Sequence, residues 1–319
     1  MENVGASDAW AVGGAGSIRI DGGQKMILHW DGRAWRRVRS VQGSLASLWA
    51  LSASSRRDVW AVGGDGKNPL ALHWNGSRWR AVPTPRTRAS NELLFNDVAT
   101  VAPDDAWAVV GYARQPLVEH WDGKSWKVDH TFPTSTIVNA IDASSEHNVW
   151  AVGTRQTPDP AGRLNDVLYH PLAMRWKATW TKAVLPGAKA QQGELLDVAV
   201  VSNREAWAVG LESDSAPRWQ TRGWTRQPTL NRLYRGSLDG ASASRPSNTW
   251  VWSTHDPPFI GRWNGRTWQA GPRVSDRGKQ HAEIQEVEAI SDHAIWVVAH
   301  YGEYEASYEV LYKYTRARS

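Results

Sequence analysis

Hydrophobic residues occur in short runs that are separated by polar turns, and this arrangement repeats along the chain. The clearest unit has four apolar runs, at residues 48–53, 58–63, 70–74 and 79–82. Each run is too short for a typical helix and is rich in β-branched and aromatic residues, so the unit predicts four short strands. Val59 and Ala61 fall on one face of the second strand, and Trp60 and Val62 on the other. An apolar residue on both faces indicates a sheet that is packed between two neighbours.

Glycine, asparagine and proline residues lie between the apolar runs, where turns are expected. Asn75-Gly76 separates the third and fourth runs, and a D-G or N-G pair of this kind predicts a tight type I′ hairpin. Gly63-Gly64 is interpreted as the end of the second strand, and Pro83 and Pro85 as the end of the fourth. The unit therefore predicts an antiparallel four-stranded meander.

The same unit recurs seven times. Its second strand is marked by a tryptophan in W-A-V-G or a related phrase, at Trp10, Trp60, Trp107, Trp150, Trp207, Trp250 and Trp296. Four strands at a period of 43 to 57 residues are typical of a β-propeller blade. We therefore predict one all-β domain over residues 1–319, a seven-bladed propeller of four-stranded blades. The terminal blades should be incomplete, because Trp10 lies close to Met1 and Tyr314 close to Ser319.

Two further tryptophans follow in most units, in the phrase H-W-D-G-x-x-W or a relative. With Gly13-Gly14, Trp30 and Trp35 in the first unit, and with Gly63-Gly64, Trp74 and Trp79 in the second, the pattern resembles the Kelch repeat. Tryptophan stands where that family usually has tyrosine, and the later units keep one glycine or none. The resemblance implies a propeller used either for protein binding or, in one branch, as a copper radical oxidase. The oxidase's Cys–Tyr cofactor is excluded here because the chain has no cysteine.

Composition excludes several other classes of function. The absence of cysteine rules out disulfides, thiolate catalysis and cysteine-ligated metals. No apolar run reaches 18 residues, so no membrane interaction is expected, and the N-terminus lacks the features of a signal peptide. The expected location is the cytoplasm, or the outside of the cell for a secreted domain without its leader. The net charge is +5, with 28 arginines and 9 lysines, a bias that suggests a GC-rich, bacterial genome. Because basic residues form no long run, we expect no nucleic-acid binding, and we expect a monomer.

Repeated residues are interpreted as framework. The seven anchor tryptophans are expected in the core. The histidine that precedes the second tryptophan (His29, His73, His120) is expected to be structural, and Asp8, Asp58 and Asp105 are expected to cap turns.

Function is expected where the template is broken. The spacing from first to second tryptophan is 12–14 residues in four units, but 20 in the first and 26 in the fourth, and 18 in the seventh if Tyr314 is counted. These loops between strands two and three should meet at one mouth of the propeller. The candidate catalytic residues there are His255, His300, Tyr301 and Tyr169. The candidate ligand-binding residues are Tyr112, Arg114, Asp166, His170, Asp256 and Glu303.

A second set of candidates lies on the first strands. Counting back from each anchor tryptophan gives an alternating polar face that should line the channel, with the acidic residues Asp97, Asp142, Asp197, Glu286 and Glu288. Oxygen-rich surfaces suit calcium or magnesium, so a bound cation is the alternative to a water-filled channel. No organic cofactor is expected.

Three functions fit these observations. The first is binding of a small polar molecule, glycan or peptide at one asymmetric site at the mouth. The second is a cofactor-independent enzyme at the same place, such as a cyclase, lyase, isomerase or hydrolase, in which His300 or His255 would transfer protons. The third is a protein-interaction scaffold.

Overall fold

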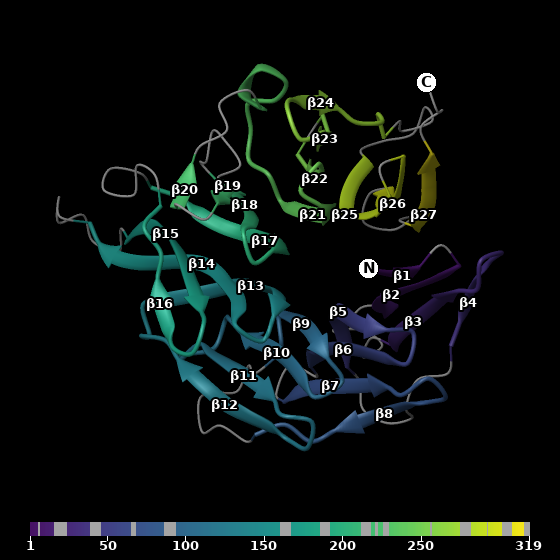
Figure 1. Cartoon of the computed structure of the whole chain (residues 1–319), viewed down its shortest axis with the longest axis horizontal. Helices are drawn as coiled ribbons and strands as arrows, with labels where there is room; N and C mark the ends of the chain where they lie inside the picture. The colour runs from purple at the N-terminus through teal and green to yellow at the C-terminus, as the bar shows by residue number, and fades with distance from the viewer. Residues whose placement is uncertain are drawn as a thin grey trace. The chain divides into compact units, whose positions relative to one another are not determined.

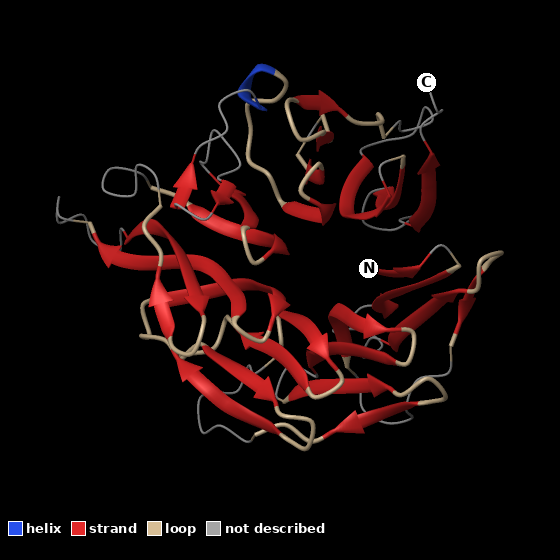
Figure 2. Ribbon diagram, viewed as in Figure 1, coloured by secondary structure: helices blue, strands red, loops and turns tan. Residues whose placement is uncertain are grey.

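The computed structural model describes the chain in fifteen stretches: residues 1–5, 7–15, 24–38, 46–64, 68–85, 94–159, 167–185, 192–211, 218–220, 223–225, 230–255, 257–274, 282–291, 293–301 and 308–315. Strands dominate these stretches (Figure 2), and the one helix among them is the 3-10 turn Leu230–Arg232. None of the described helical structure has the length or apolar character needed to cross a membrane.

The strands form successive antiparallel meanders, which we call blades and number along the chain. In blade 2, β5 (Ser47–Ser55), β6 (Asp58–Gly64), β7 (Pro69–Trp74) and β8 (Trp79–Val82) pair in sequence order. These bounds agree with the four apolar runs.

The chain divides into two compact units, described separately here. Unit 1 comprises Met1–Gln156 and Arg175–Thr181, and unit 2 comprises Thr157–Met174 and Lys182–Ser319. Besides blade 2, unit 1 contains two complete blades (Figure 1). Blade 1 is formed by β1 (Glu2–Gly5), β2 (Asp8–Ala15), β3 (Gln24–Trp30) and β4 (Trp35–Arg37), and blade 3 by β9 (Asp97–Ala102), β10 (Asp105–Val110), β11 (Leu117–Trp121) and β12 (Trp126–Thr131).

Blade 4 contributes residues to both units. Its strands are β13 (Thr136–Ser145), β14 (Asn148–Pro158), β15 (Val167–Trp176) and β16 (Trp180–Lys182).

Unit 2 contains two further complete blades and the C-terminal sheet. Blade 5 is formed by β17 (Glu194–Ser202), β18 (Glu205–Leu211), β19 (Arg218–Gln220) and β20 (Gly223–Thr225), and blade 6 by β21 (Gly240–Arg245), β22 (Asn248–Ser253), β23 (Phe259–Trp263) and β24 (Trp268–Ala270). The last sheet is formed by β25 (Ala282–Ser291), β26 (Ala294–Tyr301) and β27 (Tyr308–Thr315).

The blade count differs from the sequence prediction. Six sheets are complete four-stranded blades, whereas seven blades were predicted, and the C-terminal sheet has three strands in the described part of the chain. The expectation of an incomplete first blade is wrong. Glu2 pairs with Trp10 and Gly5 with Asp8, so β1 is the first strand of a complete four-stranded blade.

The anchor tryptophans form the core, as predicted. All seven are at most 3% exposed. In unit 1 the Trp10 ring lies 5.2 Å from Trp74 and 5.4 Å from Trp79, both in the next blade. Trp60 contacts Trp121 and Trp126 of blade 3 at 5.1 and 5.0 Å in the same way. Trp10 and Trp60 therefore each join two neighbouring blades, which explains why the repeat keeps this residue.

The D-G and N-G hairpins are wider than predicted. Trp74 pairs with Trp79, so four residues connect the strands rather than the two of a type I′ turn. Asn75 Oδ1 accepts hydrogen bonds from the Ser77 and Arg78 amides, and Gly76 has a φ of 87°. The pair is still needed, because the first residue caps the turn and only the second requires glycine.

Candidate functional site

The structure places the predicted mouth residues in both units. Tyr112 and Arg114 follow β10 in unit 1 and are exposed, and the Tyr112 hydroxyl donates to Asn139 Oδ1 at 3.1 Å. In unit 2, Tyr169 and His170 lie on β15. Thr157 Oγ1 and His170 Nε2 are 2.8 Å apart. Asp166, Asp256 and Glu303 lie outside the described residues.

The other predicted residues of unit 2 lie on two blades. His255 follows β22 of blade 6, whereas His300 and Tyr301 are the last two residues of β26. His300 pairs with Glu283 on one side and Glu309 on the other, so its backbone is part of the sheet. No hydrogen bond, ion pair or ring contact joins His255, His300 and Tyr169 to one another. The structure thus shows no assembled acid/base site among these three described residues.

His255 belongs to a local polar network of blade 6. Its Nδ1 lies 3.2 Å from Ser253 Oγ and 3.5 Å from Asp239 Oδ2, and the Tyr234 hydroxyl donates to Ser253 Oγ at 2.8 Å. Ser253 is fully buried, so its hydroxyl cannot reach a substrate as a nucleophile. The network therefore fixes the chain that follows β22, and a catalytic role of His255 stays a prediction.

Unit 1 has two strongly exposed aromatic residues, of which the sequence predicted Tyr112 as ligand-binding and missed Trp49. With Asn139, which contacts Tyr112, they define what we call the rim surface: Trp49, Tyr112 and Asn139. Trp49 lies in β5, Asn139 lies in β13, and Tyr112 connects to Asn139 from blade 3. Their first strands are linked in order, because β5 contacts β9 and β9 contacts β13. Trp49 and Tyr112 are each 59% exposed, the highest values among the described aromatic residues.

β-Bulges orient two of these side chains. The pairing of β5 with β6 skips Trp49, and the pairing of β13 with β14 skips Asn139. An extra residue of this kind changes the direction of a side chain and is frequent beside functional sites. The glycine of W-A-V-G permits the bulge, because a Cβ on Gly63 would lie 2.0 Å from the Ser47 carbonyl oxygen. Trp49 was recognisable in the sequence only as one of two tryptophans outside the repeat.

Two carboxylates of the predicted acidic channel wall, Asp97 and Asp197, bond to the backbone of the next blade. Asp97 Oδ2 accepts a hydrogen bond from the Ile141 amide of the next blade at 2.9 Å, and Asp197 Oδ2 accepts one from the Ala241 amide at 2.8 Å. The other oxygen of each carboxylate accepts from the following residue's amide. These two side chains therefore connect neighbouring blades, and their place on the channel wall stays a prediction.

The remaining acidic candidates are also engaged or buried. Asp142 Oδ1 accepts from the Ala143 amide, and Glu288 accepts from the Ser242 hydroxyl at 2.8 Å. Burial raises the pKa of Glu286. No group of three or more acidic or histidine side chains in the described chain is placed to hold a metal ion. A calcium or magnesium ion therefore stays a prediction without a described ligand set.

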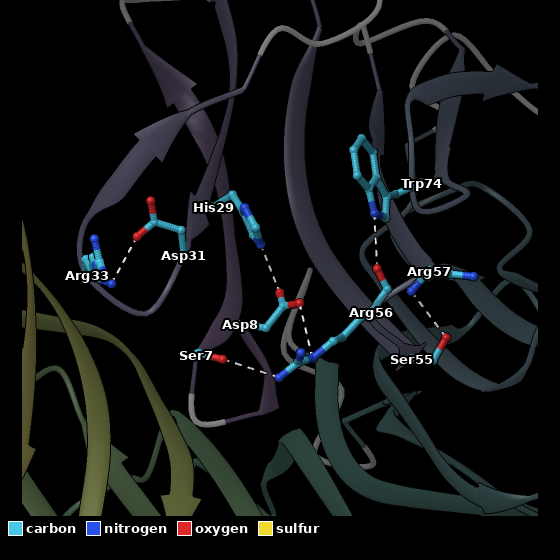
Figure 3. Close-up of polar contacts among 9 residues, drawn as sticks. All are labelled: Ser7, Asp8, His29, Asp31, Arg33, Ser55, Arg56, Arg57 and Trp74. Atoms are coloured by element: carbon cyan, nitrogen blue, oxygen red, sulfur yellow. Dashed lines mark hydrogen bonds and ion pairs between the residues drawn. The ribbon is translucent and has the colours of Figure 1, made fainter.

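The templated histidines are structural, as predicted, and their partners are the aspartates that were expected to cap turns. His29 Nε2 lies 2.9 Å from Asp8 Oδ1, as Figure 3 shows, and the His29 ring stacks on Trp10 at 4.2 Å. The pairs His73–Asp58 and His120–Asp105 repeat this contact at 2.6 and 2.8 Å. Each pair supports an anchor tryptophan, so none of these histidines is required by a ligand.

Comparison with known proteins identifies the fold. Neither a family model nor a curated protein matches the chain. Among solved structures, the chain is similar to YCF48 bound to D1 peptide, at 14% identity and a TM-score of 0.63, over 99% of this chain and 92% of that one. It is similar to the WD40 repeats of RRP9, at 14% identity and a TM-score of 0.62, over 91% and 88% of the two chains. It is also similar to Chaetomium thermophilum Sqt1 bound to the N-terminus of the ribosomal protein L10, at 10% identity and a TM-score of 0.53, over 92% and 91%.

At these identities the likeness shows the fold alone. The chain is an all-β protein with a β-propeller fold, as the repeat predicted. Membership of the Kelch family is not shown, because no family model matches.

Proposed function

We propose that the chain binds an extended peptide segment of a partner protein at the rim surface of unit 1. The observation on which this rests is the exposure of Trp49 and Tyr112, at 59% each, in a protein whose seven anchor tryptophans are at most 3% exposed. Exposing large aromatic rings to water is unfavourable, and the seven anchor tryptophans avoid it by being buried. The exposure of Trp49 and Tyr112 therefore indicates a binding surface.

The chemistry of the rim surface suits a peptide. Tryptophan and tyrosine are enriched among the residues that dominate binding energies at protein interfaces, because they bury much area with little loss of side-chain entropy. Beside the rings, the Asn139 side-chain amide offers the hydrogen-bonding groups that a peptide backbone requires. The pairing of two aromatic rings with an amide fits an extended chain better than a charged small molecule.

The similar structures support this reading. YCF48 is named as bound to D1 peptide, and Sqt1 as bound to the N-terminus of L10. Both are propellers that bind polypeptide segments, which makes a peptide the favoured ligand among the three considered. The enzyme alternative has no assembled site among the described candidates to support it.

A peptide selection tests the proposal. A library of random 12-residue peptides displayed on phage would be selected on the immobilised chain, and the enriched peptides measured by fluorescence anisotropy. We expect a shared motif, and we expect Trp49→Ala and Tyr112→Ala each to weaken binding at least tenfold, the scale of an interface hot spot.

Val128→Ala is the matched control, because Val128 is 40% exposed in the outer strand of blade 3 and should leave affinity unchanged. The proposal is wrong if no motif is enriched, or if the enriched peptides bind the Trp49 and Tyr112 variants as well as the parent chain. Gel filtration of the same samples tests the expected monomer.

A further inference from the structure

An acidic recess lies in unit 1, between blades 3 and 4, at the end of blade 3 where its Asp122-Gly123 hairpin is. It has a volume of about 470 Å³ and includes Asp104, Asp105, His120 and Glu146, with Trp176 as one wall. It is formed by the turn that precedes β10, by the turn that precedes β14, and by the second tryptophan of blade 4. The framework described above does not explain it.

The recess contains an aspartate oxygen without a partner. The three Asp–His pairs of blades 1–3 each use Oδ1 for the histidine, which leaves Oδ2 for another donor. Asp58 Oδ2 accepts from the Ser54 hydroxyl. Asp105 Oδ2 is buried and accepts no hydrogen bond, because Val101 stands at the position of Ser54. A buried carboxylate oxygen in this state is costly unless a donor reaches it.

Blade 1 shows which donor fits this place. Asp8 Oδ2 lies 3.5 Å from Arg56 Nε, and the guanidinium also donates to Ser7 Oγ at 3.3 Å (Figure 3). Arg56 comes from the turn of the following blade. In blade 3, therefore, the equivalent donor should come from the turn of blade 4.

Glu146 occupies the position of Arg56 in blade 4. The equivalence is structural, since Trp74 Nε1 donates to the Arg56 carbonyl and Trp176 Nε1 donates to the Glu146 carbonyl, both at 3.2 Å. The surrounding rings also correspond, because the distances from Trp10 to Trp74 and from Trp107 to Trp176 are both 5.2 Å. The guanidinium that Arg56 of blade 2 offers to Asp8 is thus replaced in blade 4 by the carboxylate of Glu146, which borders the recess.

The charge of the recess is unbalanced. No lysine or arginine of the described chain forms an ion pair with Asp104, Asp105 or Glu146, and the Glu146 carboxylate contacts His147 at 3.6 Å. Asp122, the fourth acidic residue, is already paired with Lys127. The recess therefore has carboxylates that no described lysine or arginine neutralises.

We propose that the acidic recess binds an arginine side chain of a partner polypeptide, in the place that Arg56 fills between blades 1 and 2. A guanidinium presents a planar fork of donors that matches a carboxylate, and it stacks on aromatic rings such as Trp176. The acidic recess shares no residue with the rim surface, so this second site goes beyond the function proposed above.

The test is an NMR titration with N-acetyl-arginine amide, which carries one guanidinium and no carboxylate. The ring protons of His120 and His147 report on the recess. We expect saturable shifts of both rings, at least tenfold weaker binding in Glu146→Arg, which supplies the internal guanidinium, and several-fold weaker binding in Glu146→Gln, which keeps the shape. Trp49→Ala should bind the probe as the parent chain does, which separates this site from the rim surface.

Two further arms make the result decisive. Arg56→Ala should open the equivalent place at Asp8 and add a second set of saturable shifts, at His29. N-acetyl-lysine amide should bind several-fold more weakly than the arginine probe, and calcium chloride should not compete with it at equal concentration. Equal binding by the lysine probe, displacement by calcium, or unchanged affinity in both Glu146 variants would overturn the proposal.

Discussion

At the scale of single residues, the informative positions are those where one blade departs from the template. Glu119 in β11 occupies the position of Leu28 in blade 1 and Leu72 in blade 2. It is 1% exposed, and its Oε2 has no hydrogen-bond partner. Burial raises the pKa of this carboxyl to about 8. The sequence shows the substitution, but only the packing shows that the carboxyl is buried without a partner.

Glu119 should make stability fall as pH rises. The unfolded carboxyl ionises near its usual pKa of 4.5, whereas the folded carboxyl stays protonated until about pH 8. Between these values the unfolded state binds fewer protons, so the free energy of unfolding decreases with pH, by an amount on the order of a few kcal/mol. We expect Glu119→Leu to stabilise the chain by that amount at pH 8 and by much less at pH 4.5, measured by urea denaturation.

The Glu119→Gln variant separates charge from packing. It should remove the pH-dependent difference but keep the cost of an unpaired buried amide. A gain in Glu119→Leu that is equal at both pH values would contradict the account.

At the scale of elements, the support of the anchor tryptophan changes along the chain. Blades 1–3 use a His–Asp pair. Blades 4 and 6 replace it by arginine and asparagine, with Arg175 and Arg262 bonded to Asn148 and Asn248, and each guanidinium lies over its tryptophan at 5.1 and 5.6 Å. A flat cation thus replaces a flat imidazole on the same ring face. The sequence did not reveal the replacement of the His–Asp pair by an Arg–Asn pair, because an arginine in a strand is normally interpreted as an exposed surface residue.

Blade 5 allows this interchange to be tested. Glu205 is buried, accepts two hydrogen bonds from Arg218, and accepts a third from the anchor Trp207. We expect Glu205→Ala to destabilise the chain by about 3–5 kcal/mol, because it leaves a buried arginine without its partner. Glu205→Asn should cost much less, because Asn248 accepts from both Arg262 and Trp250 in blade 6. Chemical denaturation of both variants checks this, and equal losses would show that the two arrangements are not interchangeable.

The connection between blades 3 and 4 gives a second prediction at this scale. Asp97→Ala leaves the Ile141 amide without its acceptor and should cost about 1–3 kcal/mol. Asp97→Asn keeps an acceptor oxygen and should cost less. Thr131→Ala, at an exposed end of β12, serves as the control with little expected effect. If Asp97→Ala is as stable as the control, the bond to the Ile141 amide does not contribute to stability.

At the scale of the whole molecule, the sequence predicted what repeats and missed what interrupts the repeat. The strands and the buried tryptophans followed from the period, because every blade must bury both faces. Trp49 and Asn139 did not follow, because a bulge inserts one residue and reverses the alternation from which side-chain directions were assigned. The alternation also could not show that the Asp97 carboxylate bonds to the Ile141 amide of the next blade. The pairing of β1 with β2 completes blade 1, although the anchor tryptophan appeared too close to Met1 for a first strand.

The molecule combines a repeated framework with a few residues that depart from the repeat. The central claim is that two of these residues, Trp49 and Tyr112, bind peptide. The most direct measurement is a crystal structure of the chain with the highest-affinity peptide from the phage selection. The account predicts that the peptide covers the rings of Trp49 and Tyr112 and makes a backbone hydrogen bond to the Asn139 side chain. A peptide bound elsewhere, with both rings still exposed to solvent, would contradict it.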